Sequence, residues 1–247
     1  MRPAFAFLAA LIAMPAHAGA VRCRLEHGAL VAPAAVAGIA GDYIIDTGQA
    51  HSILAETQAQ DAGFDGAAAL GDVLIAGQAL AGQTLDIVDL DGRSRDFATP
   101  IAGVIGADLL AGFIFDVRFS PCWLALWRPG QAPRFRPTIS LSLDWIDGAP
   151  AISASVADGP TVRSGGFTLA TGLGRAISLS PATVRAPASG QGRLRALSLA
   201  GDLFENLDAV IGPPKAALGD LGSPVLARYR LRLDFPARLL HLTPAER

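Results

Sequence analysis

One stretch decides the fold of this 247-residue chain: Tyr43-Ile44-Ile45-Asp46-Thr47-Gly48-Gln49-Ala50-His51-Ser52-Ile53-Leu54. Three strand-forming apolar residues lead directly into Asp-Thr-Gly, and a hydroxyl group and two further apolar residues follow. Gly48 permits a sharp turn of the backbone after the strand. We therefore expect a buried strand that delivers the Asp46 carboxylate to a tight loop. A carboxylate placed there needs a hydrogen-bonding or charged partner, because burial of an unpaired charge is costly.

A second apolar stretch with a central glycine follows this loop. It reads Gly103-Val104-Ile105-Gly106-Ala107-Asp108-Leu109-Leu110, and Gly106 lies 60 residues after Asp46. Together the two stretches resemble the aspartic proteases of the pepsin and retropepsin group. In that family, an apolar-apolar-Gly step forms a ψ-shaped crossing beside the catalytic loop. The resemblance implies that Asp46 is the water-activating base and that Gly106 is a ψ-loop glycine. It also assigns the active-site loop to Thr47, Gly48 and Ser52.

The whole pattern occurs twice, and a repeat of this kind bears directly on the fold. At an offset of 124, Asp46-Thr47-Gly48 falls on Ala170-Thr171-Gly172. At an offset of 116, Ile105–Phe113 falls on Leu221–Tyr229, which makes Gly222 the second ψ-loop glycine. One net deletion of eight residues accounts for the change of offset. Two lobes descended from one ancestral unit are the simplest interpretation.

The many short apolar runs, separated by glycine and proline, predict an all-β protein. The resemblance implies two pseudo-symmetric retropepsin-like barrel lobes, the pepsin-like acid protease fold, which face a central cleft. The expected parts are a signal peptide over 1–18, a first lobe with the Asp-Thr-Gly loop over 19–128, a Pro-rich linker over 129–137 and a second lobe with a degenerate Ala-Thr-Gly loop over 138–247. A helix is expected over 53–64, ending at Gly63. The candidate flap is the hairpin-tip sequence Ser189-Gly190-Gln191-Gly192.

Ala170 stands where the resemblance places a second aspartate. In the family, two carboxylates share a proton, so that one activates water while the other protonates the substrate carbonyl. A general acid or base typically contributes a factor of about 10²–10⁴ to the rate. One hypothesis is an aspartic endopeptidase in which Asp46 activates water against an extended peptide or protein substrate. The alternative is a catalytically inactive pseudoprotease that binds peptides in the cleft between the lobes. In a third hypothesis, a structural envelope protein, Asp46 merely accepts hydrogen bonds from its own loop.

Carboxylates elsewhere bear on the choice between these hypotheses. Asp202, Glu205 and Asp208 lie in the second repeat and are candidate replacements for the missing acid, although no motif directs them to the cleft. A second chain could supply its own Asp46, but the second lobe already occupies that face, so we expect a monomer rather than a homodimer. Three further aspartates are expected to be solvated at turns or strand edges: Asp108, Asp116 and Asp220.

The first residues resemble a secretory signal. Arg2 supplies a positive start, Ala4–Met14 is an apolar run too short to span a bilayer, and Ala16-His17-Ala18 matches a cleavage site. The alternative is a buried first helix. We expect an exported chain, periplasmic or secreted, with no membrane span.

The resemblance implies a peptide or protein as the partner, and composition gives no indication of a nucleic-acid partner. The chain carries 20 Lys and Arg against 22 Asp and Glu, and it has no basic run interleaved with aromatic residues of the kind that binds nucleic acid. Two cysteines and scattered histidines cannot form a zinc cage. The sequence also lacks a phosphate loop and other cofactor motifs, so no metal and no cofactor are expected.

The two cysteines, Cys23 and Cys122, belong to a chain that is expected to reach an oxidising compartment. The resemblance implies that the start and the end of the first lobe lie close together. A Cys23–Cys122 disulfide is therefore expected, and two free buried thiols are the alternative.

Thiol titration of the denatured chain distinguishes the two states of the cysteines. We expect no free thiol without reductant and two after reduction. Replacing both Cys23 and Cys122 by Ser should lower the free energy of unfolding by about 4–5 kcal/mol, because the disulfide closes a loop of roughly one hundred residues in the unfolded chain. Two thiols that titrate before reduction would contradict the disulfide.

Overall fold

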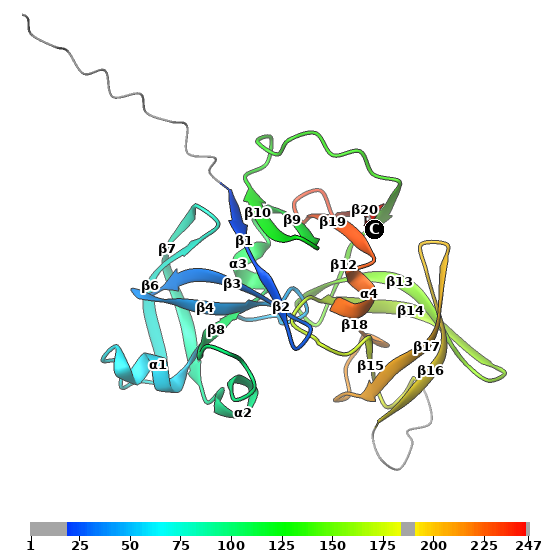
Figure 1. Ribbon diagram of the computed structural model, residues 1–247, viewed down its shortest axis with the longest axis horizontal. Coiled ribbons are helices and arrows are strands. Elements are labelled where there is room, and N and C mark those ends of the chain that lie inside the picture. The colour runs from blue at the N-terminus through cyan, green and yellow to red at the C-terminus, as the bar shows by residue number, and fades with distance from the viewer. Residues whose placement is uncertain (1–18, 184–190, 246–247) are drawn as a thin grey trace, which may run out of the picture.

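The structure, a computed structural model, describes residues 19–183 and 191–245. Two β-lobes flank a shared sheet (Figure 1), and the expected all-β fold of two barrel lobes is confirmed. The predicted signal peptide lies outside the described residues, as do Ser189 and Gly190 of the candidate flap. None of the helices in the described ranges is long and apolar enough to cross a membrane.

The first lobe is a closed barrel of six strands, because β3 pairs with both β4 and β6 and so joins the two ends of the sheet. Short helices precede or follow three of its strands. Its elements are β2 (Arg24–Glu26), β3 (Ala29–Val36), β4 (Ile39–Ile45), β5 (Ile53–Ala55), α1 (Glu56–Asp61), β6 (Ala68–Ile75), β7 (Gln78–Val88), α2 (Asp91–Ser94), β8 (Ile101–Ile105) and α3 (Ala107–Leu110). Strand β4 runs parallel to β8, which places the Asp-Thr-Gly loop beside Gly106.

The second lobe repeats the plan, and the pairing of β13 with β16 closes its barrel. Strand β14 runs parallel to β18, so that Ala170 pairs with Gly222. The elements are β12 (Asp144–Ile146), β13 (Ala149–Asp158), β14 (Thr161–Ala170), β15 (Ile177–Leu179), β16 (Gln191–Leu199), β17 (Asp202–Ile211), β18 (Gly219–Gly222) and α4 (Ser223–Leu226). The sequence repeat is thus a repeat of strand order and register.

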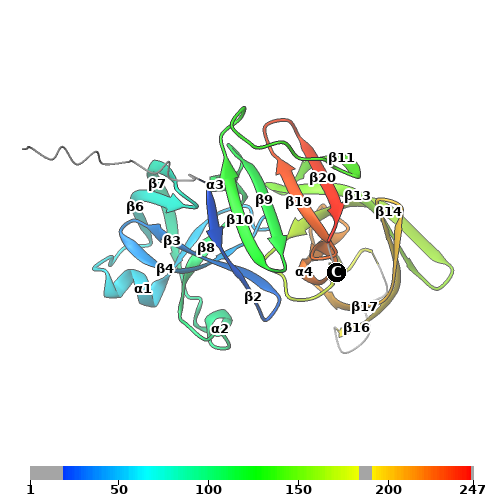
Figure 2. The same cartoon turned by 45° about the horizontal axis from the view of Figure 1, so that its top comes forward.

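A six-stranded sheet joins the lobes, in the order β1-β10-β9-β19-β20-β11. Figure 2 shows these strands side by side above the two barrels. Their bounds are β1 (Ala20–Arg22), β9 (Ile114–Phe119), β10 (Cys122–Trp127), β11 (Ile139–Ser142), β19 (Tyr229–Asp234) and β20 (Leu239–Pro244). Buried apolar residues of both lobes and of this sheet form one continuous core, so the lobes are packed as a unit.

The predicted helix over 53–64 is shorter in the structure. Ile53–Ala55 form strand β5, which pairs with β7 and β8, and only Glu56–Asp61 are helical. Barrel closure needs these three residues as a strand, and tertiary pairing overrides their local helix propensity. Gly63 has φ +86°, in keeping with its expected role after the helix.

Cys23 and Cys122 form a disulfide in the structure, with their Cα atoms 5.0 Å apart. The bond joins the segment between β1 and β2 to the start of β10. It therefore ties the first lobe to the shared sheet. The sequence contains two cysteines, and both are in this bond.

A buried ion pair crosses the middle of the shared sheet. Asp116 on β9 and Arg232 on β19 are directly opposed, and Arg232 makes two hydrogen bonds to the Asp116 carboxylate, at 2.6 and 2.7 Å. Asp116 is fully buried and also accepts the Trp127 indole N–H at 3.1 Å. The expectation that Asp116 is a solvated residue is therefore wrong, because its partner lies 116 residues away in the sequence.

Replacing Arg232 by Met should lower the free energy of unfolding by about 3–5 kcal/mol, because it leaves the Asp116 charge buried without its cation. Chemical denaturation of the purified chain measures this loss. The matched control is Arg22→Met, at an exposed arginine on β1 of the same sheet, which should cost less than about 1 kcal/mol. Equal losses in the two variants would contradict the role of the pair.

Candidate active site

Strand β4 delivers Asp46 to a tight loop, as the sequence predicts. The Asp46 N–H donates to the Ile105 carbonyl at 2.9 Å, so the residue continues the pairing of β4 with β8. Its Oδ1 accepts the Gly48 N–H at 3.0 Å. Asp46 is 7% exposed and lines a pocket between the lobes. One carboxylate oxygen is thus held by the loop, and the other is available to a partner.

Ala170 occupies the equivalent position at the end of β14, and the two loops are in close contact. A Cβ added to Gly48 would lie 2.6 Å from the Ala170 Cβ, and a Cβ added to Gly172 would lie 2.4 Å from Oδ2 of Asp46. Neither loop therefore has room for a side chain at its glycine. The Ala170 methyl group, which lines the same pocket, stands where a second carboxylate would face Asp46.

Two threonines join the loops by reciprocal hydrogen bonds. The Thr171 hydroxyl donates to the Ile45 carbonyl at 2.6 Å and accepts the Thr47 N–H at 3.1 Å. In return, the Thr47 hydroxyl donates to the Leu169 carbonyl. Both threonines are fully buried, so each bond is made without competition from water. This network fixes the Asp46 loop against the second lobe.

The two ψ-loop glycines lie against the loops that they support. A Cβ on Gly106 would lie 2.7 Å from the Gln49 carbonyl oxygen, and one on Gly222 would lie 1.9 Å from the Arg175 carbonyl oxygen. Both contacts are with backbone atoms that cannot move aside. Gly106 and Gly222 are therefore required for close packing of the crossing strands on the loops.

Ser52, which the resemblance assigns to the active-site loop, makes no hydrogen bond to Asp46 among the described residues. Its hydroxyl donates to Asp108 at 2.6 Å and accepts the Gly106 N–H at 2.8 Å. The Asp108 carboxylate also accepts the Ser52 N–H, at 2.8 Å. Ser52 thus fastens the end of the loop to the ψ crossing, and Asp108, although exposed, is a structural hydrogen-bond acceptor.

Arg93, on α2, contacts the Asp46 carboxylate. Its guanidinium lies 3.3 Å from Oδ2 of Asp46 and donates to the Gly172 carbonyl at 3.3 Å. It also reaches the Gln49 side-chain oxygen at 3.4 Å. One arginine therefore bridges the two lobes and engages the carboxylate oxygen that the loop leaves available.

The segment that carries Arg93 is anchored to β2 and β4 by charged groups. The Ala98 N–H donates to Glu26 and the Thr99 hydroxyl to Asp42, while Arg24 contacts Glu26 at 2.7 Å and Asp42 at 3.0 Å. The hydrogen bond from Arg24 holds the pKa of Asp42 below its ordinary value. The Ala98 N–H and then Arg24 lower the pKa of Glu26. Both carboxylates thus stay ionised and hold this segment over the cleft.

A second charged pair comes from the other lobe. Lys215 follows two prolines in the connection between β17 and β18, and its ammonium contacts the Asp220 carboxylate. Asp220, on β18, also accepts the Thr168 hydroxyl. It is only 9% exposed, so the expectation of a solvated strand-edge residue is wrong here too. Strand pairing with Thr168 turns its side chain inward.

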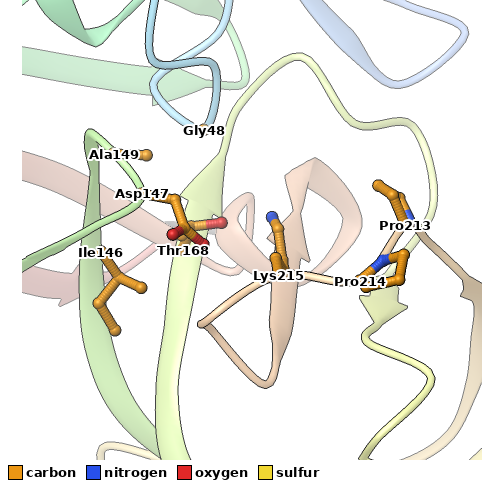
Figure 3. A pocket seen from close by; sticks show the side chains of 8 residues that line it. All are labelled: Gly48, Ile146, Asp147, Ala149, Thr168, Pro213, Pro214 and Lys215. Atoms are coloured by element: carbon orange, nitrogen blue, oxygen red, sulfur yellow. The ribbon is translucent and has the colours of Figure 1, made fainter.

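These groups line two adjoining pockets. One, of about 310 Å³, is bordered by Asp46, Arg93, Ala170, Lys215 and Asp220 together with four neighbouring residues. The other, of about 300 Å³, lies in the second lobe, and Gly48 and Lys215 border both. Figure 3 shows the Lys215 ammonium pointing into the second-lobe pocket, below the Gly48 loop.

Arg93, Lys215 and Asp220 were not identified as site residues from the sequence. The candidate replacements Asp202, Glu205 and Asp208 line neither pocket and are exposed. The repeat did contain one signal, because at the offset of 116 Asp220 falls on Val104, a buried apolar residue of the first lobe. A charged residue at a position that is apolar in the other lobe indicates that the two positions have different surroundings. Across 19–183 and 191–245, no group of three or more His, Cys, Asp or Glu side chains could hold a metal ion.

Replacing Thr171 by Val, a residue of similar shape, should lower the free energy of unfolding by about 1–3 kcal/mol. The reason is that the buried Ile45 carbonyl and Thr47 N–H would each lose their hydrogen bond to the Thr171 hydroxyl. Urea denaturation measures the change. Thr161→Val, at an exposed position at the start of β14, is the matched control and should change stability by less than about 0.5 kcal/mol. A loss no larger than that of the control would count against the threonine network.

No sequence-family model matches the chain. No curated protein matches it in sequence either. Among solved structures, the chain is similar to an aspartic proteinase from Irpex lacteus, with a TM-score of 0.56 and 13% identity. The match covers 92% of this chain and 97% of that proteinase. At this identity the likeness establishes the fold, which is the two-lobed pepsin-like barrel fold of an aspartic proteinase.

Proposed function

We propose that this chain is a pseudoprotease that binds an extended polypeptide between its lobes and does not cleave it. One observation carries the proposal. The position opposite Asp46 holds the methyl group of Ala170, and the available oxygen of Asp46 is engaged by Arg93 at 3.3 Å. The site thus has no carboxylate at position 170, and Arg93 engages the carboxylate of Asp46.

The chemistry of peptide hydrolysis explains why this arrangement disfavours cleavage. A base must take a proton from water while an acid protonates the carbonyl oxygen. Asp46 could serve only as the base, and Arg93 engages the carboxylate oxygen that would have to take the proton from water. Loss of a positioned acid or base costs a factor of about 10²–10⁴ in rate. Two such losses together would leave little turnover of an inert peptide bond.

Binding of a peptide backbone, by contrast, suits the groups that line the cleft. Arg93 and Lys215 present N–H donors, and Asp46 and Asp220 present carboxylate acceptors, one pair from each lobe. An extended peptide offers alternating carbonyl acceptors and N–H donors. The pairs therefore match the backbone of a ligand that passes between the lobes, whatever its sequence.

An aspartic endopeptidase remains a second candidate, and one observation favours it. Asp220 lines the same pocket as Asp46, so two carboxylates border the cleft even though Ala170 replaces the expected one. In this alternative Asp220 supplies the acid. The Lys215 contact opposes that role, because the Lys215 ammonium already engages the Asp220 carboxylate.

We also propose that the chain acts in an oxidising compartment outside the cytoplasm. The disulfide between Cys23 and Cys122 supports this, because structural disulfides persist mainly in exported proteins.

Proteolysis and binding measured side by side test the proposed function. The chain without residues 1–18 is incubated with an unfolded protein substrate across about pH 3–8, the range in which carboxylates change their protonation. We expect no cleavage by the wild type or by Asp46→Asn, and peptide binding by both, with affinities within about threefold because Asn keeps the shape of the loop. Isothermal titration measures the affinities.

A third variant, Ala170→Asp combined with Arg93→Ala, tests the scaffold. It restores the second carboxylate and frees the first, so detectable cleavage by this variant alone is expected. Cleavage by the wild type that disappears in Asp46→Asn would overturn the binding function and establish the endopeptidase.

A further inference from the structure

The two lobes differ on the sheet face that borders the cleft. In the first lobe this face is apolar, since Val31, Ile44 and Val104 are fully buried on three neighbouring strands. Leu90 and Phe97, from the connection between β7 and β8, pack over it and complete a small separate core. The connection thus covers this face of the first lobe.

Strand pairing identifies the equivalent residues in the second lobe. Val31 pairs with Ile44, which pairs with Val104; in the second lobe Ala151 pairs with Thr168, which pairs with Asp220. In the second lobe, Ala151 thus takes the position of Val31, Thr168 that of Ile44 and Asp220 that of Val104. Smaller and polar side chains therefore replace a complete apolar face.

The length of one connection explains the difference. Residues 89–100 join β7 to β8 in the first lobe and include α2, whereas residues 212–218 join β17 to β18 in the second. The change of repeat offset from 124 to 116 falls between these strands, since Asp86 corresponds to Val210 and Val104 to Asp220. The shorter connection cannot cover the sheet face. Its residues Pro213, Pro214 and Lys215 line the second-lobe pocket, whereas Leu90 and Phe97 pack on the apolar face of the first lobe.

The second-lobe pocket has apolar walls and charged groups. Ile146, Ala149, Pro213 and Pro214 supply the walls, and Thr168 lies beneath (Figure 3). Lys215 separates this pocket from the one that contains Asp46. A volume of about 300 Å³ accommodates one long side chain of a ligand that lies in the cleft.

Charge selects the class of side chain. The two pockets together are lined by three carboxylates and two cations. Asp46 is paired with Arg93 and Asp220 with Lys215, whereas Asp147 makes no ion pair among the described residues and accepts only the Ala216 N–H, at 2.9 Å. The charged residues that line the second-lobe pocket are Asp147 and Lys215, and Lys215 is paired with Asp220 of the adjoining pocket. Among the described residues, the Asp147 carboxylate is therefore the charge left without a counter-ion, which favours a cation.

We propose that the second-lobe pocket binds one basic side chain, arginine or lysine, of the polypeptide held between the lobes. The aliphatic part of that side chain packs on Ile146 and the two prolines, and its charged end meets the Asp147 carboxylate at the rim. The polypeptide is the ligand of the proposed function, but the pocket itself can be tested without it.

Asp147 allows a substitution that removes charge and little else. It occupies the turn between β12 and β13 with φ +52°, a conformation that Asn also tolerates. The Asn side-chain oxygen can still accept the Ala216 N–H. Asp147→Asn therefore keeps the turn and neutralises the pocket. Asp158→Asn, at an exposed carboxylate at the end of β13 outside both pockets, is the matched control.

The experiment measures binding of small probes to the chain without residues 1–18 by ligand-observed NMR titration. The probes are N-acetyl-argininamide, N-acetyl-norleucinamide and N-acetyl-glutamic acid amide. We expect the arginine probe to bind most tightly, Asp147→Asn to weaken it about fivefold, and Asp158→Asn to leave it unchanged. Lys215→Met should tighten binding of the arginine probe, because it removes a positive charge from the lining of the pocket. Added salt should weaken it.

Two results would overturn the proposal: tighter binding of the acidic probe, or an affinity for the arginine probe that Asp147→Asn does not change. Failure of the proposed function has a different signature. If long peptides do not bind but the arginine probe does, with the Asp147 dependence, the peptide-binding function fails and the basic-side-chain pocket stands.

Discussion

Reciprocal hydrogen bonds between Thr47 and Thr171 are the constraint on which the rest of the site depends. Each loop holds the backbone of the other across the boundary between lobes. The loops meet so closely that Gly48 and Gly172 have no room for side chains. This contact needs threonine and glycine in both lobes, but it needs no carboxylate in either. The second loop, which carries Ala170, therefore supports the first without a carboxylate of its own.

Each lobe places a cation beside a carboxylate at the cleft. Arg93 reaches Asp46 from the connection between β7 and β8, and Lys215 reaches Asp220 from the equivalent connection in the second lobe. In the family, the paired acids act because they share a proton and change their protonation in the reaction. Here each acid has its own counter-ion instead. Such a site holds paired donors and acceptors, and this pairing is the basis of the proposed binding function.

The difference between the lobes has a simple mechanical origin. A long connection in the first lobe lays Leu90 and Phe97 over an apolar sheet face, whereas the short connection in the second lobe leaves the corresponding face open. The polar groups at this face of the second lobe satisfy one another, since buried Asp220 accepts the Thr168 hydroxyl and pairs with Lys215 from the short connection.

The sequence by itself determined the fold, the Asp46 loop and the degenerate loop at Ala170, because strand patterns, turn glycines and the repeat are local signals that recur at fixed offsets. Only the tertiary structure decided which charged residues meet. Arg93 and Lys215 lie in connections without periodicity, and Asp116 finds Arg232 only through strand register in the shared sheet. Asp116 and Arg232 lie 116 residues apart, and no local pattern of the sequence indicates that strand pairing brings them together.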